Sequence, residues 1–300
     1  MQNLDNLTVI IVTYLTQKQI LTDCLKSISK DIKVKIIENS SSFEFKDEII
    51  QDFSNVEIHC TGENLGYGKG NNYGIKNSKT DYVLILNPDL ICDENFFYNL
   101  NKILETNNDF AIVGCQSIND KIFMPAGFFD NTKNTEFKEK FKLNKLSNFE
   151  KVEWVTGCSM LINLKKFKNE EIFDKNFFLY FEEFDLCKQV IKRGEKIFTS
   201  RDLRIHHYGF QSSLGKNQEN KKRANRIREW HWMWSSFYFY KKNYGYMNAI
   251  YKMSGKFFRS FFKITYYAIT FQKEKKEKYI HRFLGMFNSL IGKPSYFRDE

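Results

Sequence analysis

Three short apolar runs, each followed at once by polar residues, constrain the fold of this chain most. They occupy residues 9–12, 34–37 and 84–86, and longer segments separate them. Short apolar runs of this kind predict buried strands of an α/β sheet. Because ligands of open α/β sheets bind outside the carboxyl ends of the strands, the polar residues after each run are candidates for a site.

The third run ends in Asn87-Pro88-Asp89. Proline has no N–H to donate and fixes the backbone, so we expect Asp89 to leave the sheet and to be exposed at its rim. A carboxylate in that place suits a divalent cation. It also suits a turn or helix N-cap, because a helical pattern follows over residues 93–105. This motif alone leaves both interpretations open.

Side chains able to recognise a nucleotide follow the first two runs. Thr13 and Tyr14 end the first run, and Glu38 and Asn39 end the second, with three serines after them. Hydroxyl, carboxylate and amide groups can read a base and a ribose by hydrogen bonds. The order of these groups along the chain is the order expected of one nucleotide-binding half domain.

A glycine-rich segment over residues 64–72 lies between the second and third runs. Its glycines would let a ligand approach the backbone, Lys69 could face a phosphate, and its asparagines could cap the next helix. The segment is neither a P-loop nor a dinucleotide fingerprint, because no Gly-Lys-Ser/Thr ends it and the glycine spacing differs. Taken alone, it could equally be a tight connection.

A second acidic cluster starts a predicted helix that closes on Gly194. Glu182, Glu183 and Asp185 all fall in its first turn. Negative charge at a helix N-terminus stabilises by about 0.3–1 kcal/mol, which could explain these acids without any chemistry. However, Glu182 and Asp185 share a helix face while Glu183 points elsewhere, so one acid could orient while another reacts.

In this order the motifs resemble glycosyltransferase family 2, and more narrowly its rhamnosyltransferase-like branch. The resemblance rests on residues 11–14, 38–41, 64–72, 86–89, 154–162, 173–186 and 206–209. It implies an α/β fold of the GT-A type, a Rossmann-like nucleotide-diphospho-sugar transferase domain, over about residues 1–215. The nucleotide-binding half would take about residues 1–115 and the acceptor half about residues 150–215.

The same resemblance implies the residues that bind the donor and the metal. Donor contacts fall on Thr13, Tyr14, Glu38, Asn39, Asn64, Gly66, Lys69, Asn72, Asn87 and Asp89. Asp89 and a histidine would bind Mn²⁺ or Mg²⁺, and His206 is chosen over His207 because it matches better; nitrogen favours manganese. The family's Asp-x-Asp motif has Asn87 in its first position here. Glu38 replaces the usual Asp, so a dTDP- and a UDP-linked donor both stay open.

Catalysis and acceptor binding are implied as well. Glu183 matches the catalytic base, which takes a proton from the acceptor hydroxyl as the oxygen attacks the sugar with inversion. Glu182 and Asp185 complete the catalytic set, and the acceptor contacts fall on Trp154 and Gly157.

The positive charge of the chain belongs to its last part. Residues 216–300 carry 19 Lys and Arg against 6 Asp and Glu, a net charge of +13, while the whole chain has +10. A cationic stripe, Lys252, Lys256, Arg259 and Lys263, lies beside apolar and aromatic residues at helical spacing. We expect a C-terminal helical extension over residues 216–300 that lies on an anionic membrane, although its rings could instead pack on the catalytic domain. Cations mixed with rings before this stripe could bind nucleic acid, but no RNA-binding signature supports it.

Location and function follow from these patterns. Six widely spaced cysteines, no evident signal peptide and no apolar stretch of about 18 residues predict a cytoplasmic enzyme, peripheral on the inner membrane. We expect a metal-dependent inverting transferase that moves a sugar, rhamnose being one candidate, to a cell-surface or lipid-linked glycan. The alternatives are a sugar nucleotidyltransferase, or a membrane- or nucleic-acid-binding protein on a degenerate transferase scaffold. The oligomeric state is not predicted.

Overall fold

The computed structural model describes residues 4–106, 109–117, 125–167, 171–207 and 218–298. The chain forms two compact units, which we call the sheet unit and the helical unit. The sheet unit is Met1–Phe173 with Leu186–Ser213, and the helical unit is Asp174–Asp185 with Leu214–Glu300. The division expected from the sequence, near residue 215, differs in one respect, because the segment Asp174–Asp185 belongs with the C-terminal helices.

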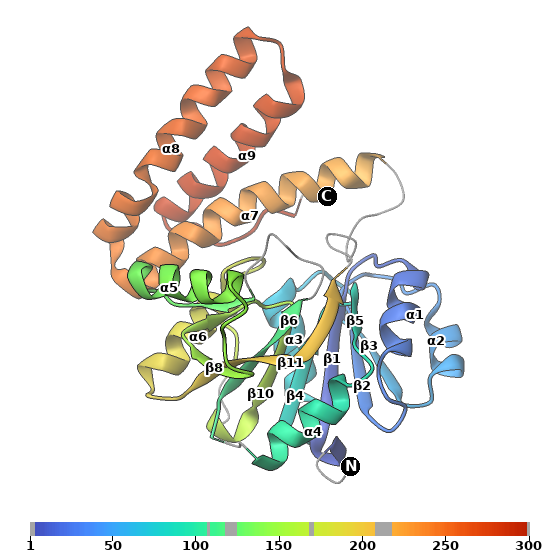
Figure 1. Cartoon of the computed structure of the whole chain (residues 1–300). Helices are drawn as coiled ribbons and strands as arrows, with labels where there is room; N and C mark the ends of the chain where they lie inside the picture. Colours follow the sequence, from blue (N-terminus) through green and yellow to red (C-terminus); the bar gives the residue numbers. More distant parts are fainter. Residues whose placement is uncertain (1–3, 107–108, 118–124, 168–170, 208–217, 299–300) are drawn as a thin grey trace. The chain divides into compact units, whose positions relative to one another are not determined.

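A mixed β-sheet forms the centre of the sheet unit (Figure 1). In the described residues, nine strands take part, in the order β3-β2-β1-β4-β10-β6-β11-β5, with β8 beside β11. The strands are β1 Leu7–Thr13, β2 Lys33–Glu38, β3 Val56–Cys60, β4 Tyr82–Leu86, β5 Leu90–Cys92, β6 Ile112–Ser117, β8 Phe149–Val152, β10 Ser159–Asn163 and β11 Ile197–His207. The strands predicted at residues 9–12, 34–37 and 84–86 are therefore confirmed. Strands β7, Ala126–Gly127, and β9, Trp154–Val155, form a separate antiparallel pair.

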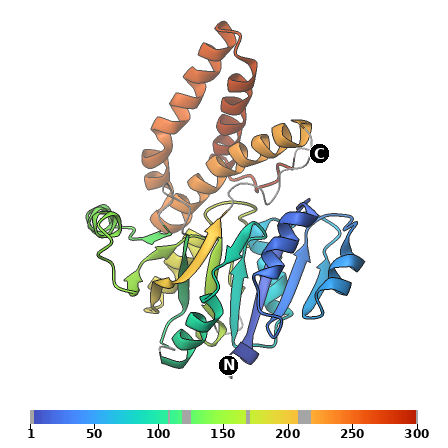
Figure 2. The same cartoon turned by 45° about the vertical axis from the view of Figure 1, so that its right-hand side comes forward.

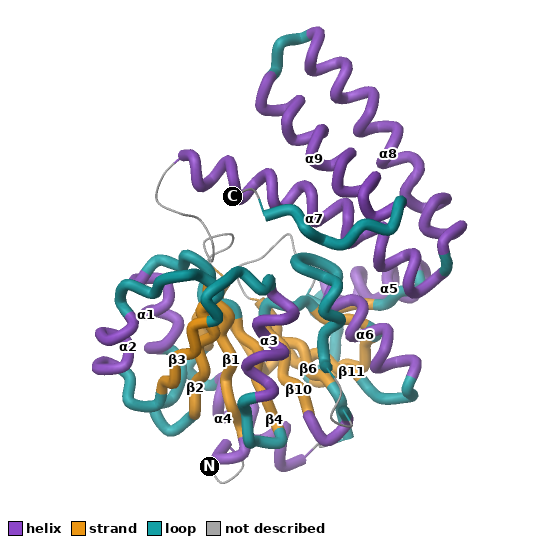
Figure 3. Tube along the Cα trace, turned by 180° about the vertical axis from the view of Figure 1, so that it is seen from behind, coloured by secondary structure: helices purple, strands orange, loops and turns teal. Residues whose placement is uncertain are grey.

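Helices cover both faces of this sheet. They are α1 Lys18–Lys26, α2 Lys46–Asp52, α3 Tyr67–Lys76, α4 Phe96–Thr106, α5 Asn131–Lys142 and the last part of α6, Glu182–Lys192, with short 3₁₀ segments at Leu4–Asn6 and Leu164–Lys166. Helix α4 lies in front of the sheet in Figure 1, and α3 lies in front of it when the molecule is seen from behind in Figure 3. These two helices therefore cover opposite faces.

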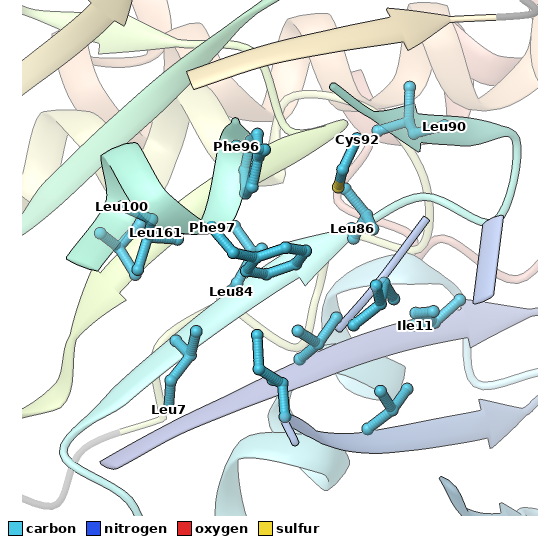
Figure 4. Packing of buried hydrophobic residues seen from close by; sticks show 14 of the residues in the cluster. Leu7, Ile11, Leu84, Leu86, Leu90, Cys92, Phe96, Phe97, Leu100 and Leu161 are labelled. Atoms are coloured by element: carbon cyan, nitrogen blue, oxygen red, sulfur yellow. The ribbon is translucent and has the colours of Figure 1, made fainter. Parts of the chain in front are cut away.

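Strand β1 contributes side chains to two hydrophobic cores. Leu7, Val9 and Ile11 lie in one cluster, and Ile10 lies in the other. Successive side chains of a strand point to opposite faces, and each fully buried Leu or Ile stabilises the fold by about 1.5–3 kcal/mol. Figure 4 shows the first cluster, in which strand residues pack against Phe96, Phe97 and Leu100 of α4.

The parallel strands fix where the polar residues meet. Strands β2, β1 and β4 are neighbours and run parallel, so their carboxyl ends lie at one edge of the sheet. Thr13, Glu38 and Leu86 are the last residues of these strands. The polar groups that follow three separate runs in the sequence are thereby brought to the same edge.

The helical unit contains α7 Gln218–Tyr244, α8 Tyr246–Ile269 and α9 Lys273–Leu290. Helices α8 and α9 lie side by side in Figures 1 and 2. The core of this unit consists of Met233, Phe237, Ala249, Met253 and Met286. Within the residues that the structure describes, no helix combines the length and the apolar character that crossing a membrane requires.

Candidate active site

Asp89 lies in a tight connection between β4 and β5. The N–H of Leu90 donates to the carbonyl of Asn87 at 3.3 Å, and the N–H of Asn87 donates to the carbonyl of Cys158 at 2.9 Å. Asp89 is only 2% exposed, so the expectation that it is exposed at the rim was wrong. The reason is that β5 begins at the next residue and pairs with β11. The chain therefore re-enters the sheet after Asp89 and does not start a helix there.

His207 is the histidine that faces Asp89. Its Nε2 lies 3.7 Å from Oδ2 of Asp89, and His207 is the pairing partner of Leu90 across β11 and β5. His206, the histidine chosen from the sequence, is the next residue along the same strand and pairs with Ile91. Neighbouring strand residues point to opposite faces, so one face of β11 presents one histidine to the aspartate.

The described residues contain no group of three or more His, Cys, Asp and Glu side chains arranged to hold a metal. The pair Asp89 and His207 nevertheless has donor atoms that suit Mn²⁺, a carboxylate oxygen and an imidazole nitrogen. Ligand atoms that each lie about 2.1 Å from one ion can be separated by up to twice that length, so 3.7 Å fits a shared cation. Such a pair leaves most coordination positions for a second molecule.

A buried carboxylate joins the ends of β1 and β2. The hydroxyl of Thr13 donates to Oε2 of Glu38 at 2.6 Å, and both residues are 1% exposed. In the part of the chain that the structure describes, the second oxygen of Glu38, Oε1, is buried and accepts no hydrogen bond. Leaving a buried acceptor unsatisfied costs about 1–3 kcal/mol, so this oxygen is available for a donor that the protein does not supply. Tyr14 is half-buried directly after Thr13.

Asn39 connects this edge to the glycine-rich segment. Its amide Nδ2 donates to the carbonyl of Gly66 at 3.0 Å, and its backbone N–H donates to the carbonyl of Thr13 at 2.8 Å. The N–H of Gly66 donates in turn to Oδ1 of Asn64 at 3.0 Å. The side chains of Asn39 and Asn64 thus both bind the backbone of Gly66, and these hydrogen bonds fix where α3 begins.

Two glycines of α3 allow close packing, and the glycine before the helix permits its N-terminal turn. Gly66, at the helix N-cap, has a φ of 83°, which favours glycine. A Cβ at Gly74 would lie 2.6 Å from Cγ2 of Ile10, and one at Gly70 would lie 2.9 Å from Cγ1 of Val12. These two glycines let α3 pack closely on β1. Lys69, directly before Gly70, is exposed in the first turn of α3.

Three other predicted residues have contacts within the protein. Both ends of the Asn72 amide bind the backbone of Phe173, at 2.8 and 2.9 Å, which gives Asn72 a structural role. The indole N–H of Trp154 donates to the carbonyl of Phe128 at 3.1 Å, and the Tyr67 hydroxyl donates to the carbonyl of Gly157. Trp154 and Gly157 stay partly exposed.

The acids at the start of α6 belong to the helical unit. Glu182 is 4% exposed, and Oε2 of both Glu182 and Glu183 is buried without a hydrogen-bond partner among the described residues. Burial raises the pKa of Glu183 to about 7, against backbone hydrogen bonds that lower it. Burial and the neighbouring Glu183 charge raise the pKa of Glu182 well above its ordinary value. The two acids therefore titrate as a pair.

The backbone before these acids is strained. Tyr180 and Phe181 have φ values of 69° and 68°, a backbone conformation that residues other than glycine rarely adopt. Residues in this conformation cost about 1–3 kcal/mol each and persist when the surrounding structure holds them. The ring of Phe181 contacts Trp232 and Phe239 of α7, with centroids 5.4 and 5.5 Å apart.

Asp185 ties this segment to α7. Its Oδ2 lies 2.6 Å from Nζ of Lys242, and its Oδ1 accepts from Asn243 at 2.8 Å. Lys242 also donates to Oδ2 of Asp174 at 2.7 Å, so one ammonium group binds both ends of the segment Asp174–Asp185. Of the three acids predicted to be catalytic, Asp185 is thus the one whose two carboxylate oxygens both bind side chains of α7.

Helix α7 and the C-terminal residues add further contacts to the same segment. The Ser235 hydroxyl donates to the carbonyl of Leu179 at 2.8 Å, the Ser295 hydroxyl donates to the carbonyl of Asn176 at 2.6 Å, and the guanidinium of Arg298 lies 3.5 Å from the ring centre of Phe178. Sequence reasoning missed these contacts and Lys242. No spacing signal marks them, because 50 or more residues separate the partners.

Comparison with known proteins gives consistent similarities. The family model described as "Glycosyl transferase family 2" matches residues 8–170, a range that includes Asp89 and ends before Glu182. The chain is 30% identical over 194 residues to the low-salt glycan biosynthesis hexosyltransferase Agl10 of Haloferax volcanii, covering 61% of each chain. It is 22% identical over 228 residues to the rhamnosyltransferase WbbL of Escherichia coli, covering 70% of this chain and 83% of the relative.

A solved structure shares the fold. The mannosyltransferase PcManGT from Pyrobaculum calidifontis, in complex with GDP-Man and Mn²⁺, superposes with a TM-score of 0.55 at 12% identity, over 95% of this chain and 87% of that one. The predicted GT-A fold is confirmed by this likeness.

Proposed function

Since the chain belongs to glycosyl transferase family 2, we propose that it transfers a sugar from a nucleoside diphosphate to a hydroxyl group of a glycan, with inversion at the anomeric carbon. The observation that carries this proposal is the buried Asp89 carboxylate with His207 at 3.7 Å, at the sheet edge where nucleotide ligands of α/β folds bind. The relatives' names agree with a hexosyl donor of this class.

Asp89 and His207 are proposed to hold a divalent cation. We expect Mn²⁺ to bind more tightly than Mg²⁺ because one of the two ligands is a nitrogen. When bound, the cation neutralises the charge that develops on the departing diphosphate. A site with one acid and one imidazole binds an ion weakly by itself, so the donor's phosphate oxygens would complete it. Lys69, exposed in the first turn of α3, adds a positive charge for the same phosphates.

Glu38 is proposed to recognise the base. Thr13 occupies one of its oxygens and leaves Oε1 to accept the imide N–H that uracil and thymine share. Asn39 directly follows Glu38 in the sequence, and Tyr14 directly follows Thr13, which binds this carboxylate. We therefore propose a UDP- or dTDP-linked donor, with rhamnose as the first sugar to test because the E. coli relative is named a rhamnosyltransferase.

Glu183 is proposed as the catalytic base. With its pKa raised to about 7, it is a stronger base than an ordinary carboxylate and is still ionised in part at neutral pH. It takes the proton of the acceptor hydroxyl while the acceptor oxygen bonds to the anomeric carbon and the bond from that carbon to the diphosphate oxygen breaks. Glu182, whose pKa burial and the neighbouring Glu183 charge also raise, would orient its neighbour.

We also propose that the acceptor is a cell-surface or lipid-linked glycan and that the enzyme works on an anionic membrane surface. Trp154 and Gly157 are the proposed acceptor contacts, since both are partly exposed. The cationic C-terminal part of the chain, with 19 Lys and Arg against 6 Asp and Glu over residues 216–300, supports the membrane location.

A donor panel tests the reaction. The purified protein is incubated with UDP- and dTDP-linked sugars and with Mn²⁺, Mg²⁺ or EDTA, and the release of nucleoside diphosphate is measured. We expect metal-dependent release from at least one donor, which Asp89→Ala abolishes while the exposed control Glu94→Ala does not. Release of pyrophosphate from a nucleoside triphosphate and a sugar phosphate would instead indicate a nucleotidyltransferase. Absence of release from every donor would overturn the proposal in favour of a binding protein.

A further inference from the structure

The outward face of α8 exposes a row of large apolar side chains. Met247, Tyr251, Phe258, Phe262 and Ile269 are 74%, 79%, 57%, 66% and 71% exposed. Their spacing of four, seven, four and seven residues places them on one stripe of a helix. Single exposed apolar residues are common, but a continuous stripe marks an interaction surface.

This stripe is not the face that holds the helical unit together. Ala249 and Met253 are fully buried and form the core of the unit with residues of α7 and α9. Phe257 is also on this inner face, because it packs against the core that contains Met253. Two distinct apolar faces therefore run along α8, and only the inner one is used in the folded unit.

A cationic flank lies between these two faces. Lys252, Lys256, Arg259 and Lys263 follow each other by four, three and four residues, and no ion pair joins them to an acid within the described residues. Residues 246–291 contain nine Lys and Arg and two acids, a net charge of +7. The two acids, Glu274 and Glu277, face cations of α7, Lys222 at 3.4 Å and Arg226 at 3.3 Å.

The turn between α8 and α9 continues the pattern. Phe271 is 93% exposed there, next to Ile269, and Lys273, Lys275 and Lys276 follow. An exposed ring at a turn that lysines follow in the chain can enter the boundary between headgroups and acyl chains while the lysines stay with the phosphates.

We propose that the outward stripe of α8 and the turn at residues 270–272 form a docking surface for an anionic phospholipid bilayer. This proposal specifies which surface would bring the enzyme to the membrane. It rests on the proposed function only in assuming that docking brings a transferase to its acceptor. Apolar rings would insert at the depth of the headgroups, and the cationic flank would bind anionic lipid. Burial of apolar surface and electrostatic attraction would therefore both contribute to binding.

Charge complementarity favours lipid over another copy of this chain. A second copy would bring the same cationic flank against the first, and like charges in contact are unfavourable. An acidic bilayer would instead neutralise all the positive charges of this flank at once. The stripe has the additional property that its members are rings and long aliphatic chains, which interfacial helices prefer.

Vesicle sedimentation with the full chain tests the proposal. We expect strong partition into phosphatidylcholine vesicles containing 30% phosphatidylglycerol, at least tenfold weaker partition into pure phosphatidylcholine, and a loss of binding at high salt. Phe258→Ser combined with Phe262→Ser should lower partition at least tenfold, and so should Lys252→Gln combined with Arg259→Gln. The matched control is Tyr98→Ser, which removes a ring of similar exposure, 53%, from α4 of the sheet unit.

The readouts separate docking from catalysis. Nucleoside diphosphate release in solution and circular dichroism should be the same for all these variants, because none of the changed residues belongs to the proposed active site. Equal binding of the wild type and both double variants to anionic vesicles would overturn the docking surface, as would binding of the wild type to neither vesicle. Self-association that the ring variants abolish, without lipid binding, would assign the stripe to a second copy instead.

Discussion

Lys242 and Asp185 form an ion pair of 2.6 Å between residues that lie 57 positions apart in the chain. The same ammonium group binds Asp174 at 2.7 Å. Two ends of a twelve-residue segment are thereby tied to one point of α7, and this segment carries the proposed base. The C-terminal helices thus contribute to the order of the acids that are proposed to be catalytic.

Lys242→Met should lower transfer about 10- to 100-fold, because small misplacements of a catalytic group have effects of this size. The loss should appear in kcat, with the KM for the donor within a factor of about two, since Lys242 is not a proposed donor contact. Steady-state kinetics with both substrates varied would measure it. Lys241→Met is the matched control, because the neighbouring lysine lies 5.8 Å from the Tyr246 ring centre and not on the acid segment. Equal losses in both variants would contradict the assignment.

Glu183→Gln should lower transfer about 10²- to 10⁴-fold, the usual contribution of a general base. Binding of the nucleoside diphosphate, measured by calorimetry, should change less than about twofold. Glu182→Gln should have the smaller effect on transfer, because Glu182 is proposed to orient its neighbour and the amide of Gln keeps a side chain of the same length that can form hydrogen bonds. A larger loss for Glu182→Gln than for Glu183→Gln would move the base to Glu182.

The pH dependence of kcat/KM should follow the ionisation of Glu183. With a raised pKa of about 7, activity should rise between about pH 6 and pH 8, and this rise should disappear in Glu183→Gln. A pH profile of the wild type that is flat over this range would contradict the assignment.

Stability should change with pH in the opposite direction. The pKa of Glu183 in the folded state is above its unfolded value, so its contribution to stability is complete below about pH 4.5 and is lost as the pH rises through about 7. Glu183→Gln should therefore be more stable than the wild type at pH 8, and this gain should vanish near pH 5. Urea unfolding at both pH values measures it, with the exposed Glu139→Gln as the control.

His207→Ala should weaken Mn²⁺ binding about tenfold or more in the presence of nucleoside diphosphate, because it removes one of two proposed protein ligands. His206→Ala is the matched control on the same strand and should change the affinity less than about twofold. Electron paramagnetic resonance of free Mn²⁺ gives both affinities without requiring turnover. The reverse order of the two variants would restore the choice of His206.

Much of the sheet could be predicted because its signals are local. The apolar runs that became β1, β2 and β4 each carry their own pattern, and the polar residues after them necessarily share an edge once the strands are parallel. The acids at the start of α6 were visible for the same reason, since their positions in a first turn follow from spacing alone.

The remaining features depend on pairing between distant segments. The burial of Asp89 and its closeness to His207 follow from the register of β5 on β11, which aligns Leu90 with His207 across more than one hundred residues. The role of Asp185 depends on Lys242, and the roles of Gly70 and Gly74 depend on side chains of β1. No local pattern specifies any of these contacts.

The grouping of Asp174–Asp185 with residues 214–300 bears on how such an enzyme can be shortened. A gene fragment that stops near residue 215 would encode every strand of the sheet and every acid of the proposed mechanism. Its product would still lack Lys242, Ser235 and Ser295, so the segment Asp174–Asp185, which carries Glu182 and Glu183, would lose the contacts that hold it. Expression of the catalytic half by itself is therefore expected to yield a nucleotide-binding protein that transfers nothing.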